Sequence, residues 1–383
     1  MITSAIATID LPAIYHNFSV IKEHLPGKKI LAMIKSNGYG HGLIPVAKTL
    51  STADALGVAT LSEALTLREN GIHSTIVVMR GFATQEELSI FIQDPHLIPC
   101  VHHHSQLQLL KNLTAPLSIW LKIDTGMHRL GFSVAEFDLI YRQLNAISFI
   151  EKNFVICTHL ADADNPDTSF TQQQMAAFKH ATKNTPNPKS ILNSAGIVAH
   201  INSCIEYSKK DTSSRGESPR DPGHTSAVEW IRPGIMLYGA SPFALDNPQT
   251  AFFNRLRPAM TLSSTLLSIK TISVGEKIGY SCTYEAKKEM RIGIVGIGYG
   301  DGYLRNIQTG APVLLHGKRC FVVGRVSMDM IAIDLSAVPE AAINDAVILW
   351  GTVDLSVTEV AHHANSIAHD LLCHSGNRVD MRY

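Results

Sequence analysis

The chain has 383 residues, of which 45% are hydrophobic and 17% are charged. This length exceeds one ordinary domain, so we expect two domains. Lys and Arg together number 33, as do Asp and Glu. The balance supplies no positive field that would attract nucleic acids or anionic membranes. We therefore expect no nucleic-acid partner and no membrane partner.

The apolar runs all fall well short of the roughly 20 residues that a membrane span needs. The amino-terminal segment MITSAIATID lacks the basic region of an export signal. The six cysteines lie far apart and include no CxxC pair, which favours reduced thiols over disulfides or a zinc site. The sequence thus predicts a soluble, cytoplasmic protein without a metal ion.

Helix signals begin close to the amino terminus. Apolar residues recur at helical spacing over residues 11–25, behind Asp10 as a candidate N-cap and with Pro12 in the first turn. Three later pairs have capping-box spacing, in which a hydroxyl precedes a carboxylate by three residues. They predict further helix starts at Thr60 with Glu63, Thr84 with Glu87, and Ser133 with Glu136.

Short apolar runs alternate with these helices and are typical of strands buried on both faces. The runs are residues 31–35, 55–59, 75–79, 97–101, 117–123 and 154–158, with shorter candidates at 190–193 and 235–238. The alternation predicts a (β/α)8 barrel over residues 11–244, with a doubly wound open sheet as the alternative. In a barrel, polar residues at the carboxyl ends of strands carry the chemistry.

The remaining residues, 245–383, are short β-rich segments punctuated by Gly and Asp. They predict a mostly β domain, which we expect residues 1–10 to join. Residues 314–319 predict a hairpin whose turn uses Gly317. Residues 208–226 are rich in Ser, Pro, Gly and charge, and predict a solvated excursion from the barrel.

The strongest chemical signal is AMIKSNGYGHG, residues 32–42, in which Lys35 ends an apolar strand. A lysine held there is partly desolvated, which lowers its pKa and suits a Schiff base with a carbonyl cofactor. A strand-end lysine that simply reaches water is the alternative. The glycines and Tyr39 that follow favour the first interpretation, because such a loop can approach an anionic ligand closely.

This segment resembles the pyridoxal phosphate (PLP) lysine motif of the alanine racemases. Further segments resemble that family's other signatures in the same order: WLKIDTGMHRLGF (120–132), THLADAD (158–164), NSAG (193–196), WIRPGIMLYG (230–239), IGYSCTYEA (278–286), IGYGDGYLR (297–305) and GRVSMDM (324–330). The resemblance covers nearly the whole chain. It implies a PLP-dependent isomerase that interconverts L- and D-alanine and supplies D-alanine for peptidoglycan.

The resemblance also implies roles for individual residues. Lys35 would carry the cofactor and serve as one catalytic base, and Tyr280 would be the other. Cofactor contacts would come from Tyr39, His159, Ser194, Arg232, Gly234 and Ile235. Arg129, Met328 and Tyr299 would meet the substrate, and Lys122 would be carbamylated as in many members. Because Lys35 and Tyr280 fall in different domains, the family pattern implies a homodimer in which the partner's Tyr280 completes each site.

The chemistry supports these roles independently of the resemblance. Racemisation breaks a Cα–H bond on one face and remakes it on the other, so two bases must flank a flat carbanion. Lysine and tyrosine both have unperturbed pKa values near 10, which burial or a nearby cation must lower. An arginine such as Arg232 beside the pyridine nitrogen opposes protonation of that ring, and this favours racemisation over transamination.

Alternatives remain for several residues and for the activity. Tyr280 could be an ordinary sheet tyrosine, and Asp124 is a simpler partner for Arg129 than a carbamylated Lys122. The chain departs from the family pattern at Asn377, where a tyrosine is common, and at Ser327, where a cysteine is common. A racemase for another small amino acid and a non-catalytic PLP carrier are the competing functions.

Overall fold

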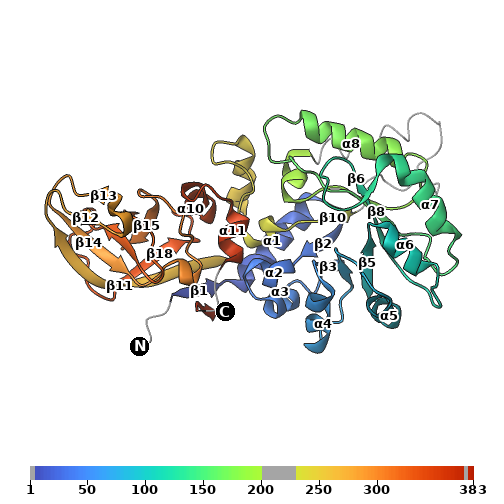
Figure 1. The fold of residues 1–383 in the computed structure, drawn as a ribbon, viewed down its shortest axis with the longest axis horizontal. Coiled ribbons are helices and arrows are strands. Elements are labelled where there is room, and N and C mark those ends of the chain that lie inside the picture. Colours follow the sequence, from blue (N-terminus) through green and yellow to red (C-terminus); the bar gives the residue numbers. More distant parts are fainter. Residues whose placement is uncertain (1–4, 201–229, 375–377) are drawn as a thin grey trace.

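The computed structural model describes residues 5–200, 230–374 and 378–383. Within them the chain forms a barrel and a β domain that lie side by side along the long axis of the molecule (Figure 1). The excursion predicted over residues 208–226 and the departure at Asn377 both lie outside the described residues. Among the described residues, no helix is long and apolar enough to span a bilayer.

The barrel wall is made of parallel strands. In the described chain its eight strands are β2 (Lys29–Met33), β3 (Ala55–Val58), β4 (Ile76–Val78), β5 (Leu97–Val101), β6 (Trp120–Asp124), β8 (Val155–Cys157), β9 (Lys189–Ser190) and β10 (Trp230–Ile231). Each pairs with the next in sequence, and β10 pairs back with β2. This closed ring confirms the predicted (β/α)8 barrel and excludes the doubly wound open sheet. The short β7 (Phe132–Ser133) extends from β6.

The prediction of a strand at residues 235–238 is wrong. The last barrel strand ends at Ile231, and Ile235–Tyr238 form a short 3-10 helix instead. Pro233 lacks the amide hydrogen that a strand ladder needs, and Gly234 takes φ −124° and ψ −95°. A run of four buried apolar residues fits either a strand or a helical turn, so periodicity alone could not decide between them.

Helices cover the outside of the barrel (Figure 1). They are α1 (Leu11–His24), α3 (Leu43–Thr49), α4 (Leu61–Glu69), α5 (Gln85–Gln93), α6 (His104–Leu110), α7 (Phe137–Ala146) and α8 (Ser169–Thr182). Their predicted starts are confirmed. Asp10 accepts a hydrogen bond from the Ala13 amide at 2.8 Å, and Thr60 and Thr84 cap α4 and α5. Ser133 caps a 3-10 turn that leads into α7.

The β domain is built on one curled, mostly antiparallel sheet. Its strands run in the spatial order β14 (Met290–Val295), β17 (Ile331–Asp334), β16 (Lys318–Val322), β15 (Pro312–Leu315), β18 (Ala346–Trp350), β11 (Met260–Ile272), β1 (Ile6–Ile9) and β19 (Asp380–Arg382). The sheet closes on itself because β14 also pairs with β11, which leaves β1 and β19 outside the closed part. The predicted hairpin is confirmed, with His316 and Gly317 at φ 50° and 72° between β15 and β16.

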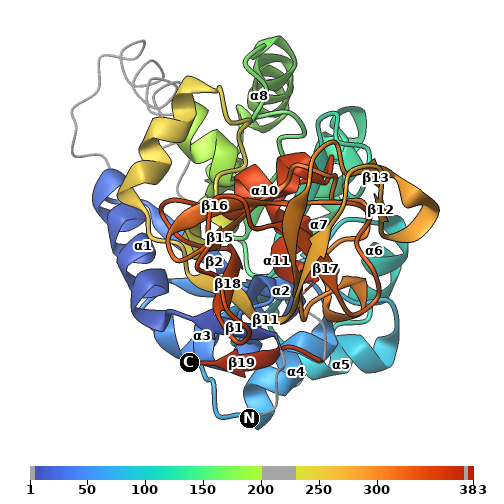
Figure 2. The ribbon, with the colours of Figure 1, turned by 90° about the vertical axis from the view of Figure 1, so that its left-hand side faces the viewer.

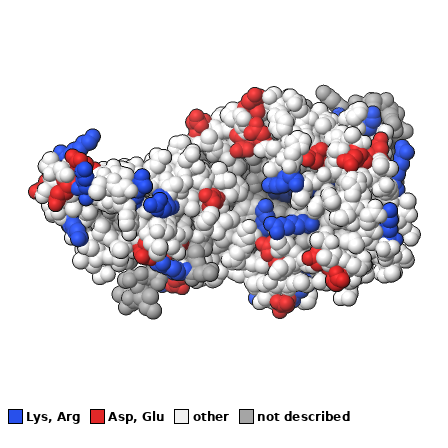
Figure 3. All heavy atoms as spheres, in the orientation of Figure 1, with Lys and Arg blue, Asp and Glu red and all other residues white. Residues whose placement is uncertain are grey.

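The two domains are joined closely. Strand β1, which precedes the barrel in the chain, lies in the β-domain sheet between β11 and β19. Two short helices of the β domain, α10 (Val357–His363) and α11 (Ala368–Cys373), turn toward the barrel, and α11 contacts α2 (Lys35–Tyr39) (Figure 2). The proposed division at residues 244 and 245 remains a prediction. Lys and Arg are interspersed with Asp and Glu on the face drawn in Figure 3.

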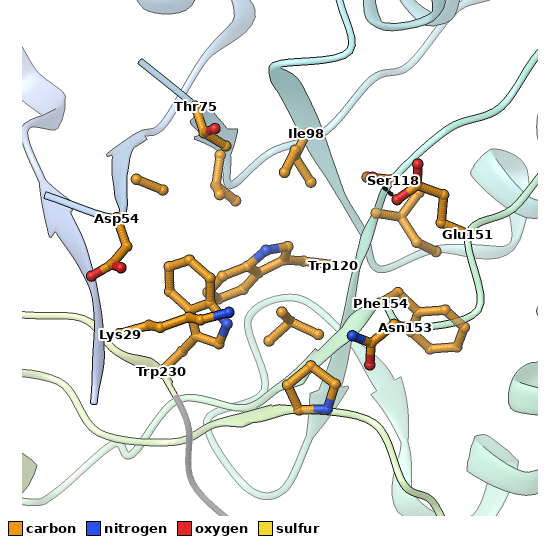
Figure 4. Close-up of a pocket in the computed structure, with 15 residues that line it drawn as sticks. Lys29, Asp54, Thr75, Ile98, Ser118, Trp120, Glu151, Asn153, Phe154 and Trp230 are labelled. Atoms are coloured by element: carbon orange, nitrogen blue, oxygen red, sulfur yellow. Dashed lines mark hydrogen bonds between the residues drawn. The ribbon is translucent and has the colours of Figure 1, made fainter. Parts of the chain in front are cut away.

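The amino-terminal end of the barrel is closed by aromatic side chains. The rings of Trp120 and Trp230 meet edge to face with centroids 5.5 Å apart, and Lys29 Nζ lies 5.4 Å from the Trp230 ring (Figure 4). A shallow pocket outside this pair is rimmed by Asp54 and Glu151. Because this end is opposite to the carboxyl ends of the strands, it is separate from the pocket that holds Lys35.

Candidate active site

Lys35 lies just past the carboxyl end of β2, where the barrel opens into a pocket. The residues that the sequence predicts for the barrel part of the site all line it: Lys35, Tyr39, Lys122, Arg129, His159, Ser194, Arg232, Gly234 and Ile235. They come from distant parts of the chain and meet because the parallel strands end at one rim. The structure therefore brings the barrel half of the predicted site together.

The backbone after Lys35 makes an unusual left-handed turn. This turn lies within the residue range of α2. Ser36, Asn37, Gly38 and Tyr39 have φ values of 54°, 54°, 63° and 52°. A left-handed conformation costs a residue with a side chain about 1–2 kcal/mol. Three of the four carry side chains, so tertiary contacts must hold the turn. Such stored strain is common where a reactive group is positioned.

Burial and nearby positive charges favour the neutral forms of Lys35 and His159. Burial, followed by the Arg129 charge, lowers the pKa of the Lys35 ammonium. Burial, followed by the Arg232 charge, holds the pKa of His159 well below its usual value. His159 is consequently neutral at neutral pH, and the Lys35 amine is easier to deprotonate than a lysine in water.

Arg232 is buried at the centre of the pocket floor. Its guanidinium donates to Ser190 Oγ and to the Thr158 carbonyl, each at 2.6 Å, and lies 3.4 Å from His159 Nδ1. The neutral ring of His159 can accept a hydrogen bond there. Burial lowers the pKa of Arg232 from its very high ordinary value, but arginine stays charged in proteins. A fixed positive charge therefore faces the pocket.

The same pocket contains a cradle of hydrogen-bonding groups. Ser194 Oγ accepts a hydrogen bond from the Gly234 amide at 2.9 Å. A Cβ added to Gly234 would lie 2.4 Å from the Tyr39 hydroxyl, so this position requires glycine for the close approach. Two hydroxyls and a backbone amide that converge without a side chain between them are well suited to bind an anion such as a phosphate.

His369 of α11 is a pocket residue that sequence reasoning missed. Its ring centroid is 6.0 Å from that of Tyr39, and it lines the same pocket. Its Nδ1 is buried and has no hydrogen-bond partner among the described residues. Burial, followed by the Lys35 charge, lowers the pKa of His369 to about 4. No motif marks it, because only the packing of α11 on α2 brings it to the barrel.

Lys122 points into the barrel from β6 and is only 7% exposed. It is the register partner of Cys157 on β8. Burial lowers the pKa of Lys122 most, against an opposing effect of Cys157. A hydrogen bond with Cys100 and the nearby charges of Lys122 and Arg232 lower the pKa of Cys157 to about 6. Cys157 is thus a titratable neighbour of Lys122 that the sequence did not suggest.

Asp124 does not serve as the counter-ion that the sequence offered for Arg129. Its carboxylate accepts hydrogen bonds from the amides of Gly126 and His128, each at 3.0 Å. It also lies 3.3 Å from the His128 ring nitrogen. These contacts hold the loop between β6 and β7, so the carboxylate has a structural role.

The remaining site candidates lie in the β domain, outside the Lys35 pocket. Tyr280 is 63% exposed, and Tyr299 and Met328 are exposed as well. Tyr299 and Met328 belong to touching loops, because the Gly300 amide donates to the Met328 carbonyl at 2.8 Å. Tyr280 follows β12 (Lys277–Ile278) at the end of the domain far from the barrel (Figure 1). One chain therefore does not bring Tyr280 to Lys35.

Comparison with known proteins decides the family. Residues 9–210 match the model of the alanine racemase N-terminal domain, and residues 259–383 match that of the alanine racemase C-terminal domain. This chain belongs to the alanine racemase family. The alanine racemase of Coxiella burnetii (strain CbuG_Q212) is 48% identical, and the match covers 98% of this chain and 97% of that relative. The alanine racemase of Shewanella denitrificans is 42% identical, with 97% of each chain covered.

Solved structures of alanine racemases share the whole fold. The biosynthetic alanine racemase from Pseudomonas aeruginosa matches with a TM-score of 0.88 at 35% identity, covering 100% of this chain and 99% of that chain. The alanine racemase from Acinetobacter baumannii has a TM-score of 0.87 at 33% identity and the same coverage. The barrel and the β domain are thus both part of the family's architecture.

Proposed function

We propose that this protein is a PLP-dependent alanine racemase that uses Lys35 and Tyr280 as its two bases. Interconversion of L- and D-alanine is its activity, and we assign it to the supply of D-alanine for peptidoglycan. The observation that carries the proposal is the convergence of a desolvated Lys35, the Arg232 charge and the Ser194–Gly234 cradle in one barrel pocket. The family membership agrees with it.

The pocket fits PLP in its donor set. Tyr39, Ser194, Gly234 and Ile235 would hold the phosphate, because they offer hydroxyls and backbone amides in a space that a side chain at Gly234 would fill. Arg232 would face the pyridine nitrogen as a fixed cation. When bound, PLP supplies the electron sink that makes the Cα–H of an amino acid acidic.

The chain's own residues then manage the proton. The lowered pKa of Lys35 makes its neutral amine more accessible than that of a lysine in water, and this amine would accept a proton and return it on the same side. Arg129, which also lines the pocket and lowers the pKa of Lys35, would bind the substrate carboxylate. A second group must act from the other side, and Tyr280 is our candidate.

We propose that two copies form the working enzyme. Tyr280, Tyr299 and Met328 are exposed on the β domain, and none of them lines the Lys35 pocket of the same chain. A homodimer in which the partner's Tyr280 enters the pocket would bury these apolar side chains and complete the site. Tyr299 and Met328 would then meet the substrate.

Two routes can neutralise the positive charge of the buried Lys122. Carbamylation would convert its buried ammonium into an anion that can orient Arg129, and an ionised Cys157 would balance the charge without modification. Intact-mass measurement under bicarbonate and after acid treatment separates the two. We also propose a cytoplasmic location, because Cys100 and Cys157 are hydrogen-bonded free thiols, which a reducing compartment preserves.

The activity is tested by incubating the purified protein with PLP and a panel of L-amino acids and measuring each enantiomer by chiral chromatography. We expect turnover of L- and D-alanine, with much slower turnover of larger side chains. Turnover that favours another small amino acid would support the competing racemase. Cofactor binding without turnover of any panel member would support a non-catalytic PLP carrier.

A further inference from the structure

The left-handed turn after Lys35 is held at both ends by hydrogen bonds. Inside it, the Gly38 amide donates to the Ile34 carbonyl at 2.8 Å, and the Gly42 amide donates to the Asn37 carbonyl at 2.9 Å. The Asn37 side chain accepts from the Leu43 amide at 2.8 Å, which ties the turn to α3. The first of these bonds closes the turn around Lys35 and Ser36, and the other two fix its distal part.

The first amide of the turn has a partner from another element. The Ser36 amide, one residue after Lys35, donates to Glu63 Oε1 at 2.7 Å. This carboxylate belongs to α4, 27 positions along the chain. Strands β2 and β3 are neighbours in the barrel, so the start of α4 and the end of β2 share one rim.

The second oxygen of Glu63 is fully engaged at its own helix. Glu63 Oε2 accepts from the amides of Ala59 at 2.8 Å and Thr60 at 3.1 Å. The Glu63 amide in turn donates to Thr60 Oγ1 at 3.2 Å. The capping box thus orients the carboxylate rigidly, with one oxygen on the helix start and the other on the Ser36 amide.

A neighbouring helix supplies a natural comparison. Glu87 at the start of α5 accepts from the Ala83 amide at 2.6 Å, and its own amide donates to Thr84 Oγ1 at 3.3 Å. The contacts found for the Glu87 carboxylate are thus local to α5. Glu63 differs from Glu87 in reaching across to the backbone of Lys35.

We propose that Glu63 is a positioning residue for Lys35: its carboxylate fixes the Ser36 amide, and thereby the left-handed turn that aims the lysine into the pocket. The proposal rests on the function assigned to Lys35 above. The side chains that act electrostatically on Lys35 come from several elements: Arg129, Arg80, Cys373 and Glu63 itself. His159 and His369 respond to the Lys35 charge. Glu63 is the carboxylate in this group.

The test compares Glu63→Gln with Glu87→Gln in the PLP-loaded enzyme. A glutamine keeps one acceptor oxygen, so it cannot serve both the helix start and Ser36. We expect Glu63→Gln to lower kcat by about 10- to 100-fold with a much smaller change in KM. The pH midpoint of the visible absorption band of the Lys35-bound cofactor should move down, because a negative charge near the nitrogen is lost. Glu87→Gln should leave both unchanged at a similar loss of thermal stability.

Hydrogen exchange gives a readout that needs no turnover, and its main test uses the unmodified protein. In the unmodified protein we expect the Ser36 amide to be protected as strongly as the Gly38 amide, and Glu63→Gln to remove the protection of Ser36 first. A freely exchanging Ser36 amide in the unmodified protein overturns the proposal even where Glu63→Gln does not fold. Equal kcat and equal absorption midpoints in the two variants overturn it as well.

These outcomes are distinct from a failure of the proposed function. If Lys35→Ala keeps racemase activity, the role of Lys35 is wrong, whereas protection of the Ser36 amide still reports whether Glu63 holds the turn. If Lys35→Ala is inactive and Glu63→Gln behaves like Glu87→Gln, only the positioning role fails.

Discussion

The barrel and the β domain hold their shares of the proposed site in opposite ways. Lys35 lies in a pocket among buried partners, and the backbone that follows it is tied to α3 and α4. Tyr280 is 63% exposed, and the hydrogen bond that closes its short helix is local, from the Cys282 amide to the Gly279 carbonyl at 3.2 Å. One half of the proposed site is built within a single chain, and we propose that a partner chain completes the other.

The two halves share one backbone device. Left-handed residues that are not glycine follow both proposed bases, namely Ser36, Asn37 and Tyr39 after Lys35, and Ser281 and Cys282 after Tyr280. Each side chain therefore projects from a sharply bent segment instead of a regular helix or strand. The comparison teaches that the barrel fixes its bend by tertiary hydrogen bonds, whereas the bend after Tyr280 is exposed in the single chain.

The largest effect is expected at Lys35. Lys35→Ala removes the amine that would bind the cofactor covalently and accept a proton, so activity should fall below detection. Borohydride treatment followed by peptide mass spectrometry should find the cofactor on Lys35 in the unmodified protein and on no lysine of the variant. Racemisation of alanine by the pure variant at more than a trace rate would contradict the assignment.

Tyr280→Phe should come next. The variant should keep cofactor binding, because Tyr280 lies outside the barrel pocket, and lose racemisation by about 10²–10⁴-fold in both directions. Because both directions share one cycle, solvent deuterium incorporation into each enantiomer separately is the sharper measurement.

Mixing the two inactive variants tests the shared site. A mixed dimer of Lys35→Ala and Tyr280→Phe contains one site with both natural bases, so activity should reappear on mixing after subunit exchange. Failure to recover activity, with exchange verified by native mass spectrometry, would argue against completion of each site by the partner.

The next prediction concerns the stability of the folded protein, and it compares a buried histidine of the barrel with an exposed one. Burial lowers the pKa of His41 to about 4, below its ordinary value near 6.5. Between those values the unfolded chain binds a proton that the folded chain does not, so His41 costs stability as pH falls from about 6.5 to 4. The loss is at most roughly 3 kcal/mol.

Denaturant unfolding at several pH values measures this effect. His41→Gln should flatten the loss of unfolding free energy between pH 6.5 and 4, whatever its stability at neutral pH. The exposed His73 is the control, and His73→Gln should leave the slope as it is. An unchanged slope in His41→Gln would remove His41 as the source of acid sensitivity.

The smallest expected effect is at the cradle. The Cβ of Gly234→Ala would lie 2.4 Å from the Tyr39 hydroxyl, so that hydroxyl must shift, and PLP affinity should fall about tenfold. Tyr39→Phe removes the oxygen that meets the new methyl group. The double variant should consequently lose less affinity than the two single losses combined, as titration by absorbance would measure. Simple additivity would mean that the contact does not set affinity.

Much of the barrel could be predicted from its sequence, because alternating apolar runs and capping residues are local signals. The starts of α1, α4 and α5 and the closed order of strands agree with them. The 3-10 helix Ile235–Tyr238 was misread as a strand, since four buried apolar residues have no period of their own.

The residues of the site could be predicted from the sequence, but much of their geometry could not. Family motifs mark Lys35 and Arg232, but nothing in the motifs marks a left-handed turn at Ser36 and Asn37. The capping pair of Thr60 and Glu63 is visible in the sequence, whereas the second use of Glu63 depends on the adjacency of β2 and β3. His369 likewise reaches the pocket only through tertiary packing.

The position of β1 has a consequence for how the protein is made. This strand is synthesised before the barrel, yet its neighbours β11 and β19 come from residues 260–272 and 380–382. During translation, Ile6–Ile9 have no sheet partner until β11 has been made, and their second partner, β19, is made only at the end of the chain. If the two domains were expressed as separate fragments, β1 would be on the barrel fragment and its sheet partners on the other. Each fragment would therefore need the other in order to fold completely.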